Sequence, residues 1–514
     1  MFLVVIIVIL AIYLYGTRTF KYWEIRNIKH DKPIFLVGTN LKNYLAQRNV
    51  TQQAESVYWR YPNEKVVGFY RGWRPELLIR DPDIVRSVLK SDFSHFHKRG
   101  LNQHEKVEPM LRNLFFVEGD VWRMLRHRTT PAFTTSKLKA MFPLVLDCIE
   151  RIQQRISLLT INDVATITST YDLMSRYTTD LICATGFNIE AGALKDDDSH
   201  LLKLGKRIFS ADIRDIVVFA LKDILPEISS KLYTFHSDIE HNFFSLIRNV
   251  IRLKNDKQAT ERTDFIDLLL ECKNKGPMVD LSIDKTKPDG TPEIVTEVMD
   301  EELMAAQAFI YFVAGSGTSA SVMSFILHQL ANNPDVQQKA QEEIDRILLK
   351  YNNNFTYDGI KEMSYVLSIL KEGLRMFPPI GFISRKCTRP YTFEDLNLTI
   401  DKDVTVIIPV KALHNDPLYF DDPDEFRPDR FYLKNMKPNK KRIFIPFGDG
   451  PRSCVGNRMA MLQNVSGLAA VLSHFNVEPA PNTERYPELV PSTNLIQICK
   501  NGLPLQFRRR KTVS

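Results

Sequence analysis

The sequence predicts a mainly α-helical protein with a small β region, built as a single large domain behind an N-terminal membrane anchor. Three observations predict this class. Helical hydrophobic periods recur along most of the 514 residues, and β-rich segments are few and lie late in the chain. After about residue 40, no Ser/Gly linker, low-complexity tract or internal repeat divides the chain. We therefore expect one large folded body, not several modules.

The first element is an apolar N-terminal helix. Phe2 to Tyr15 is an uninterrupted apolar run, which Gly16 and Thr17 extend towards the ~20 residues that span a bilayer. Positive charges follow this run at Arg18, Lys21, Arg26 and Lys29, and by the positive-inside rule they place the rest of the chain in the cytosol. A cleaved signal peptide or a buried helix is the alternative.

This reading predicts three segments. Residues 1–17 form a signal-anchor transmembrane helix, 18–38 an interfacial linker and hinge, and 39–514 the catalytic domain. The aromatic residues Phe20, Tyr22 and Trp23 suit a membrane interface.

Three later helices are predicted from their periods and ends. Glu301 to Leu330 begins with acidic residues and is apolar nearly all round in its first half, which indicates burial. Asp335 to Lys350 has one apolar face, and Ser364 is a candidate cap for a helix that runs to Met376. Strand-like segments follow at Thr388 to Thr399 and Val404 to Pro409.

Composition limits the kinds of partner. The chain is 44% hydrophobic and 25% charged, as in ordinary globular proteins, and its net charge is +7. This modest charge favours acidic partners or anionic lipid and does not indicate nucleic acid. Six cysteines lie far apart with no CxxC spacing, so we expect reduced thiols in a cytosol-facing protein.

The most informative motif surrounds Cys454. Phe447 to Gly456 reads F-x-x-G-x-R-x-C-x-G, and good helix formers follow it. A cysteine at the start of a helix, with backbone N–H groups facing its sulfur, favours the thiolate that binds metals. The alternative is a buried structural cysteine beside a Gly/Pro turn.

The middle of the 301–330 helix is unusual. Two glycines, Gly315 and Gly317, interrupt it within Ala314 to Ser319, and each costs ~1 kcal/mol relative to alanine. A helix that opens there would direct Thr318 and a free carbonyl towards a ligand or water. A tight helix–helix crossing that requires small residues is the alternative.

Together these two motifs resemble those of the cytochrome P450 family. Its haem-thiolate signature matches Phe447 to Gly456, and its oxygen-binding pattern [A/G]-G-x-[D/E]-T-[T/S] matches Ala314, Gly315, Thr318 and Ser319. The resemblance implies the cytochrome P450 fold, haem b with Cys454 as axial thiolate, and a catalytic role for Thr318, Ala314 and Gly315. Gly317 stands where the family has an acid, so we expect oxygen activation to use Thr318 and ordered water.

The resemblance extends over roughly residues 85 to 510 and implies further site residues. Glu372, Arg375 and Arg430 resemble the family's Glu–Arg–Arg cluster, which would lock the loops that present Cys454. In the cysteine motif and elsewhere, the expected haem-binding residues are Trp122, Arg126, Arg385, Phe447, Arg452 and Gly456. The sequence is most similar to those of insect microsomal enzymes, from the clan that contains the vertebrate drug-metabolising oxidases.

These relationships imply a monooxygenase of the endoplasmic reticulum membrane, with its catalytic domain in the cytosol and a lipophilic small molecule, xenobiotic or endogenous, as substrate. No strand-borne G-x-G-x-x-G is present, so electrons are expected from NADPH through a partner reductase, with cytochrome b5 as a second candidate donor. Membrane lipid is a further partner. An oxygen-independent haem-thiolate isomerase or dehydratase is an alternative, as is a low-turnover haem protein that sequesters lipophilic ligands.

Two surface features complete the expectations. Cations near the two haem-binding motifs suggest a basic docking face for an acidic flavoprotein: Arg123, Arg128, Lys434, Lys437, Lys440, Lys441 and Arg442. Arg508 to Lys511 is expected to be a soluble tail.

By resemblance, the substrate pocket draws on the 100–120 loop, the 205–245 region, Phe309, Phe312, Ala314, Ile380 to Ile383, and Ser492 to Leu495.

Overall fold

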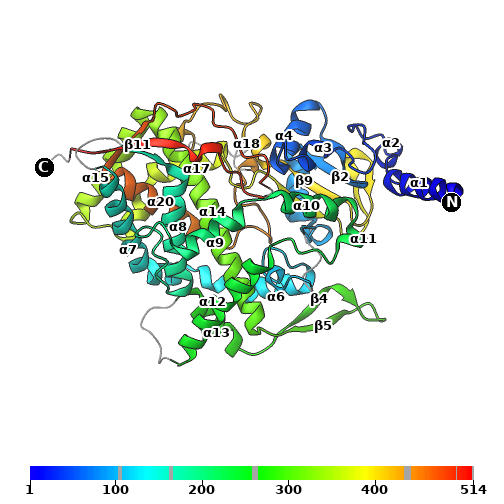
Figure 1. Ribbon diagram of the computed structural model, residues 1–514, viewed down its shortest axis with the longest axis horizontal. Helices are drawn as coiled ribbons and strands as arrows, with labels where there is room; N and C mark the ends of the chain where they lie inside the picture. Colours follow the sequence, from blue (N-terminus) through cyan, green and yellow to red (C-terminus); the bar gives the residue numbers. More distant parts are fainter. Residues whose placement is uncertain (102–106, 161–165, 257–263, 433–441, 494, 512–514) are drawn as a thin grey trace.

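A computed structural model describes residues 1–101, 107–160, 166–256, 264–432, 442–493 and 495–511. Long helices fill one end of the molecule, and the largest sheet lies towards the other, where the N-terminal helix α1 (Phe2–Thr17) projects from the body (Figure 1). A mainly α-helical fold with small β regions is therefore confirmed. By length and composition α14 (Glu301–Asn332) could cross a membrane, but most of it is buried in the protein; α1 is apolar but shorter.

The helices fall into two groups by length. After α1, those of ten or more residues among the described residues are α4 (Val50–Arg60), α6 (Gly119–Thr129), α7 (Thr135–Leu159), α8 (Thr170–Phe187), α9 (His200–Phe209), α10 (Ile213–Ile224), α12 (Ser237–Asp256), α13 (Phe265–Asn274), α14, α15 (Pro334–Lys350), α17 (Ser364–Met376) and α20 (Asn457–Leu472). The short ones are α2 (Tyr22–Ile25), α3 (Leu41–Tyr44), α5 (Pro82–Arg86), α11 (Pro226–Ser229), α16 (Tyr357–Glu362) and α18 (Val410–His414).

The strands form four small sheets. They are β1 (Val66–Arg71), β2 (Arg74–Ile79), β3 (Thr166–Ser169), β4 (Met278–Thr286), β5 (Pro292–Glu297), β6 (Ile383–Lys386), β7 (Tyr391–Phe393), β8 (Leu398–Ile400), β9 (Thr405–Ile408), β10 (Phe475–Pro479) and β11 (Pro504–Arg509). The largest sheet has the order β1-β2-β9-β6, with β2 and β9 parallel and the other neighbours antiparallel. The other sheets are β10-β11-β3, the β4–β5 hairpin and β7–β8.

Two large apolar cores lie in the two parts of the molecule, one among the long helices and one around the largest sheet. The larger one lies among the helices and contains the buried side chains of α7, α8, α14, α17 and α20. The smaller one lies around the β1-β2-β9-β6 sheet and includes Trp23 from α2. Residues of both cores border the Phe447–Gly456 loop region, because Phe447 packs against the first and Ile445 belongs to the second.

Strand content is the main respect in which the sequence-based prediction was wrong. β1 and β2 lie early in the chain, and β4–β5 precedes α14, whereas strands were expected only late. The reason is that β2 pairs with β9, more than three hundred residues away (Leu77 opposite Val406), so a long-range pairing stabilises a short apolar run. The two late strand segments were placed correctly, as β7–β8 and β9.

The helix periods were more reliable than the helix ends. α15 and α17 form where their apolar faces predicted. Ser364 is not the cap of α17, however, because it is the first helical residue and Met363 stands at the cap position, where it makes no side-chain hydrogen bond. The buried Glu343 carboxylate on α15 caps the helix instead, accepting from the N–H groups of Tyr365 (2.8 Å) and Val366 (3.0 Å).

Both ends of the chain are tied to the body more closely than expected. Trp23 is fully buried, and its indole N–H donates to the Phe69 carbonyl at 3.2 Å, so it is not free to lie at a membrane interface. The Arg508–Lys511 segment is not a free tail: Arg508 and Arg509 lie in β11, and Arg510 Nη2 lies 2.5 Å from Asp345.

Candidate haem-thiolate site

Cys454 lies in a tight loop directly before α20. Its backbone N–H donates to the Phe447 carbonyl at 2.8 Å, which closes the loop. Gly450 has a φ of +70°, and a Cβ there would lie 1.9 Å from the Leu89 carbonyl oxygen, so only glycine fits. The thiol is accessible although protein surrounds it, which means that it borders an internal space.

The electrostatic surroundings of the thiol are mixed. Burial raises the pKa of the Cys454 thiol, while the Gly456 N–H and the guanidiniums of Arg126 and Arg99 act in the opposite direction. The net pKa of the Cys454 thiol is above the usual value. The expectation that the loop and helix terminus favour the thiolate is therefore wrong for these two features by themselves. A coordinated cation would favour the thiolate, because a metal-bound thiol loses its proton.

Next to Cys454 lies a group of four buried or half-buried guanidiniums, which we call the arginine cluster: Arg99, Arg126, Arg385 and Arg452. Arg126 donates to the Ser453 carbonyl (2.8 Å), and Arg99 donates to the Arg452 carbonyl (3.1 Å). Arg452 stacks over the ring of the buried Trp122, 4.2 Å from its centroid. The structure thus brings together Trp122, Arg126, Arg385 and Arg452, which the sequence motifs had singled out separately.

Arg99 was missed, because it belongs to no recognisable motif. Its only sequence signal is its place in the basic run His97-Lys98-Arg99, shortly after the helical segment that ends near Ser91. The tertiary structure places it over the Phe115 ring, 4.6 Å from the centroid, and beside Arg452.

The arginine cluster fits an anionic ligand. Burial and the neighbouring guanidiniums lower the pKa of Arg452 to about 8, and burial lowers that of Arg99 to about 10. Arg99 Nε, Arg385 Nε and Arg452 Nη2 are buried without a hydrogen-bond partner in the part of the chain that the structure describes. Unpaired like charges are expensive to bury. Two carboxylates in fixed positions, as on haem, would neutralise them, and Arg suits such planar acceptors.

The predicted Glu–Arg–Arg cluster assembles in the structure. Glu372 and Arg375 are fully buried and form a two-bond ion pair, with both N···O distances 2.9 Å. Arg430 Nε lies 3.2 Å from the same carboxylate. None of the three is within the cysteine loop.

A path of hydrogen bonds links this cluster to that loop. Arg375 donates to the His414 carbonyl at 3.1 Å, and His414 Nε2 accepts the N–H of Ile445 at 3.0 Å. Ile445 lies two residues before Phe447, whose carbonyl accepts from Cys454. Burial and the Arg375 charge lower the pKa of His414 to about 3, so its ring is neutral and Nε2 is free to accept.

On α14, two side chains at i and i+4 are the exposed part of an otherwise buried stretch. Ala314 is exposed and Thr318 is half-buried, and the Thr318 hydroxyl donates to the Ala314 carbonyl at 2.6 Å. Ser316 is buried and donates to the Phe312 carbonyl. Of the two side chains, that of Thr318 is therefore the more exposed.

The two glycines of α14 serve packing and do not open the helix, which continues through them without a break. A Cβ at Gly315 would lie 2.3 Å from Ile182 Cδ1 of α8, and one at Gly317 would lie 2.4 Å from the Phe209 ring at the end of α9. The Gly315 carbonyl also accepts from Gln463 of α20 at 3.0 Å. The tight-crossing alternative is thus the one that the structure supports.

A cavity of about 320 Å³ lies beside this part of α14. Residues of α8, α9, α14 and the 490–498 segment line it, Phe209, Ser316, Gly317, Ser492 and Thr493 among them. Of the regions expected to form the substrate pocket, the 205–245 region and Ser492–Thr493 contribute to it. The described part of the 100–120 loop, Phe309, Phe312, Ala314 and Ile380–Ile383 do not line this cavity.

The basic docking face stays an expectation, and the structure shows which contacts its described members make. Arg123 Nε lies 2.9 Å from Asp280, and Arg128 donates to the Gly276 and Pro277 carbonyls, so both belong to an intramolecular contact. Arg442 lies 3.9 Å from Asp83. Lys434, Lys437, Lys440 and Lys441 lie outside the described residues.

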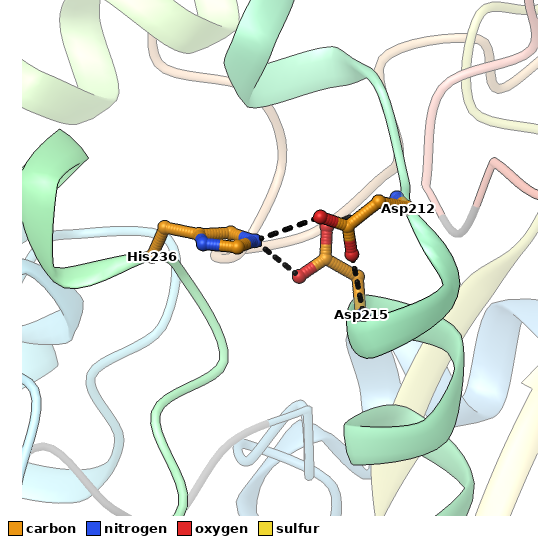
Figure 2. Close-up of side chains that lie close together, drawn as sticks. All are labelled: Asp212, Asp215 and His236. Carbon is orange, nitrogen blue, oxygen red and sulfur yellow. Dashed lines mark hydrogen bonds and ion pairs between the residues drawn. The ribbon is translucent and has the colours of Figure 1, made fainter.

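Away from these groups, Asp212, Asp215 and His236 have ligand atoms within 4.8 Å of one another (Figure 2). His236 Nε2 lies 3.1 Å from Asp212 and 3.3 Å from Asp215. Asp212 and Asp215 also form the capping box of α10, and Arg214 lies 2.9 Å from Asp215. These contacts satisfy the three side chains, so the cluster joins the start of α10 to the segment before α12.

An accessible thiol beside a cluster of four arginines fits one class of protein: a haem-thiolate protein. Comparison with known proteins agrees, because the cytochrome P450 family model matches residues 29–503. Cytochrome P450 6B7 of Helicoverpa armigera is 33% identical over 508 residues, covering 99% of this chain and 98% of that protein. Cytochrome P450 6B1 of Papilio polyxenes is 32% identical over 99% of this chain and 100% of its own length.

The probable cytochrome P450 6a23 of Drosophila melanogaster is 31% identical over 515 residues, with 99% of this chain and 98% of that protein covered. The chain therefore belongs to the cytochrome P450 family, and membership implies a haem-thiolate oxidase or monooxygenase.

Proposed function

We propose that this protein is a membrane-bound monooxygenase that inserts one oxygen atom from O2 into a lipophilic, largely neutral small molecule. The observation that carries the proposal is the convergence of Cys454 with the arginine cluster, three of whose guanidiniums keep a buried nitrogen without a hydrogen-bond partner among the described residues. Bound haem would supply the oxidising chemistry, which a thiolate ligand favours. Cys454 would bind its iron, and Trp122 together with the arginine cluster would hold its carboxylates.

The remaining site residues would act on position and protons. Phe447 and Gly456 shape the loop that presents the thiol, and the Gly456 N–H tempers the basicity of the sulfur. Ala314 and Gly315 keep the α14 face small and close to its neighbours, and the Thr318 hydroxyl would exchange its hydrogen bond to the Ala314 carbonyl for one to a bound ligand or water. Glu372, Arg375 and Arg430 would hold the cysteine loop through His414.

Electrons must come from outside, since the sequence contains no nucleotide-binding fingerprint. We propose NADPH–cytochrome P450 reductase as the donor, and cytochrome b5 as a candidate second one. The proposed substrates are xenobiotics such as plant toxins or insecticides, or endogenous lipids and hormones.

The surface around α1 supports seating at the endoplasmic reticulum membrane. In Figure 1, α10 and α11 lie on the side of the body towards α1, and the Tyr15 hydroxyl of α1 donates to Glu227 of α11 at 2.6 Å. Exposed apolar side chains recur on α10 at i, i+4 and i+8: Ile213, Val217 and Leu221. Such a face beside an apolar helix suits a lipid interface.

The test has two stages. Reduced protein with carbon monoxide should show the red-shifted absorption of a thiolate ligand, and Cys454→Ala should abolish it. A reductase-coupled screen of lipophilic compounds, read by mass spectrometry, should then find products that carry one added oxygen and consume NADPH. Retention of the band by Cys454→Ala would contradict the proposal.

Gly317 is the observation that favours a second candidate, an oxygen-independent isomerase or dehydratase, since it removes an acid near Thr318. Turnover of a hydroperoxide without reductase, and none with NADPH and O2, would favour it. Tight ligand binding without any turnover would instead indicate a sequestering protein.

A further inference from the structure

The β4–β5 hairpin projects from the body beside α6, the helix that carries Trp122 and Arg126 (Figure 1). Its inner side is bonded along that helix. Asp120 of α6 accepts from the Ser282 hydroxyl (2.7 Å) and from the Ile283 N–H (2.6 Å), and Asp280 pairs with Arg123. The hairpin is therefore fastened to α6 at several successive points.

Asp284 extends this contact to the start of α6. A Cβ at Gly119 would lie 2.0 Å from Asp284 Oδ2, so the carboxylate occupies the space that a side chain would need. Its Oδ1 lies 3.3 Å from Lys98 Nζ and 3.5 Å from Nε2 of the buried His97. Gly119 thus admits an acid that reaches the 97–100 segment from the hairpin.

The 97–100 segment is where two members of the arginine cluster are held. Arg452 Nε donates to the His97 carbonyl at 2.9 Å, and Arg99 donates to the Arg452 carbonyl. The other side of the segment is bonded to β6, because the Lys386 N–H donates to the Lys98 carbonyl and the Ser384 hydroxyl to that of Arg99. The 97–100 segment is therefore held on one side by Asp284 of β4 and on the other by β6.

Firm support is needed here for an electrostatic reason. The guanidiniums of the arginine cluster repel one another, and their hydrogen-bond partners are backbone carbonyls that carry no full charge, so a shift of the segment would separate them. Arg side chains bind carboxylates well only when their planar donors are kept in register.

We propose that Asp284 is a positioning residue for the haem carboxylates: from the hairpin it holds the 97–100 segment, and so places Arg99 and Arg452. This inference rests on the proposed haem-thiolate function. Asp284 touches neither Cys454 nor the cluster itself, and it acts through His97 and Lys98.

The test compares two acids of the same hairpin in the full chain loaded with haem. Asp284→Asn keeps the shape and removes the charge; Asp289→Asn is the control, because Asp289 lies at the hairpin tip and accepts only from Thr291. Transfer of haem to excess apomyoglobin should be about fivefold faster for Asp284→Asn than for wild type, and unchanged for Asp289→Asn.

A second readout separates positioning from general stability. With Arg99 and Arg452 held less firmly, less positive charge stabilises the added electron, so the reduction potential of Asp284→Asn should be more negative while its melting temperature stays near that of Asp289→Asn. In a Lys98→Met background, where the partner ammonium is gone, Asp284→Asn should add little to the rate of haem loss.

The inference would be overturned if Asp284→Asn and Asp289→Asn lost haem at the same rate and had the same reduction potential. It would also be overturned if Asp284→Asn accelerated haem loss as much in the Lys98→Met background as in wild type. Failure of the wild-type protein to show the thiolate spectrum would instead overturn the proposed function, so the two failures are distinguishable.

Discussion

Gly317 is the residue at which this chain departs from the family's oxygen-binding pattern, and Phe209 occupies the space beside it. The ring fills the place where the first atom of any side chain would lie. An acid cannot simply be restored there, because it would meet both the ring and a buried environment. Any test of the missing acid therefore requires a change at Phe209 as well.

The first prediction concerns this contact. Gly317→Ala should lower the free energy of unfolding by about 1–3 kcal/mol through overpacking against Phe209, and by less in a Phe209→Ala background. Urea denaturation of the two single variants and the double variant measures the coupling.

Gly205→Ala in α9 is the matched control, because its new Cβ would meet the Phe312 ring at an ordinary 3.5 Å. It should be neutral or slightly stabilising, since alanine is the better helix former. If Gly317→Ala behaves in the same way, the contact with Phe209 does not explain the glycine.

The second prediction concerns the buried His414, whose folded-state pKa of about 3 lies below the usual ~6.5. Above pH ~6.5 both folded and unfolded forms are neutral, so the stability is fully present; as pH falls below that value, only the unfolded form takes up the proton. His414 should then cost up to about 1.4 kcal/mol of stability per pH unit.

His414→Gln keeps an acceptor for the Ile445 N–H but does not titrate. Its unfolding free energy should fall less steeply between about pH 6 and 4 than that of wild type, with the exposed His241→Gln as control. Denaturation curves at a series of pH values would show equal slopes if His414 were not responsible.

At the scale of elements, the start of α17 shows why helix ends were harder to predict than helix faces. The apolar period of Ser364–Met376 is local and was readable from the chain, whereas the capping group is a carboxylate on the neighbouring α15. The β4–β5 hairpin was missed for a related reason. Its polar inner side is stabilised by Asp120, Arg123 and the 97–100 segment, which lie far away in sequence.

The third prediction tests this cap. Glu343→Ala leaves the N–H groups of Tyr365 and Val366 buried without an acceptor, and should cost about 2 kcal/mol of unfolding free energy. Glu342→Ala, one position earlier and exposed, should cost only a few tenths. Similar midpoints for the two variants in urea denaturation would contradict the capping role.

At the scale of the whole molecule, apolar surface gathers where α1, α10 and α11 lie near one another, and Ile213 is 81% exposed there. The Tyr15–Glu227 hydrogen bond joins α1 to this surface, so under the proposed membrane seating the two would meet the bilayer together. The body would then sit with the α10–α11 face against the lipid, while the helical end around α15 points away (Figure 1).

The fourth prediction follows from this orientation. A tryptophan introduced by Val217→Trp on α10 should be quenched by brominated lipids when the full chain is bound to vesicles. The control Leu349→Trp on α15, also at an exposed position, should not be quenched. Since the four native tryptophans contribute to both, the comparison is made against wild type. Equal quenching in the two variants would contradict the orientation.

The chain alone was sufficient to predict the mainly α fold, the thiol at Cys454 and most of the arginines around it, because these depend on local periods and on short motifs at fixed spacing. Only the tertiary structure decided the rest. Arg99 lies in the arginine cluster, and Phe209 lies against Gly317. The β4–β5 hairpin pairs its Asp280 with Arg123 and places Asp284 beside His97. Each of these contacts connects segments far apart in sequence, and their physical basis is packing and charge compensation between elements, for which no local pattern exists.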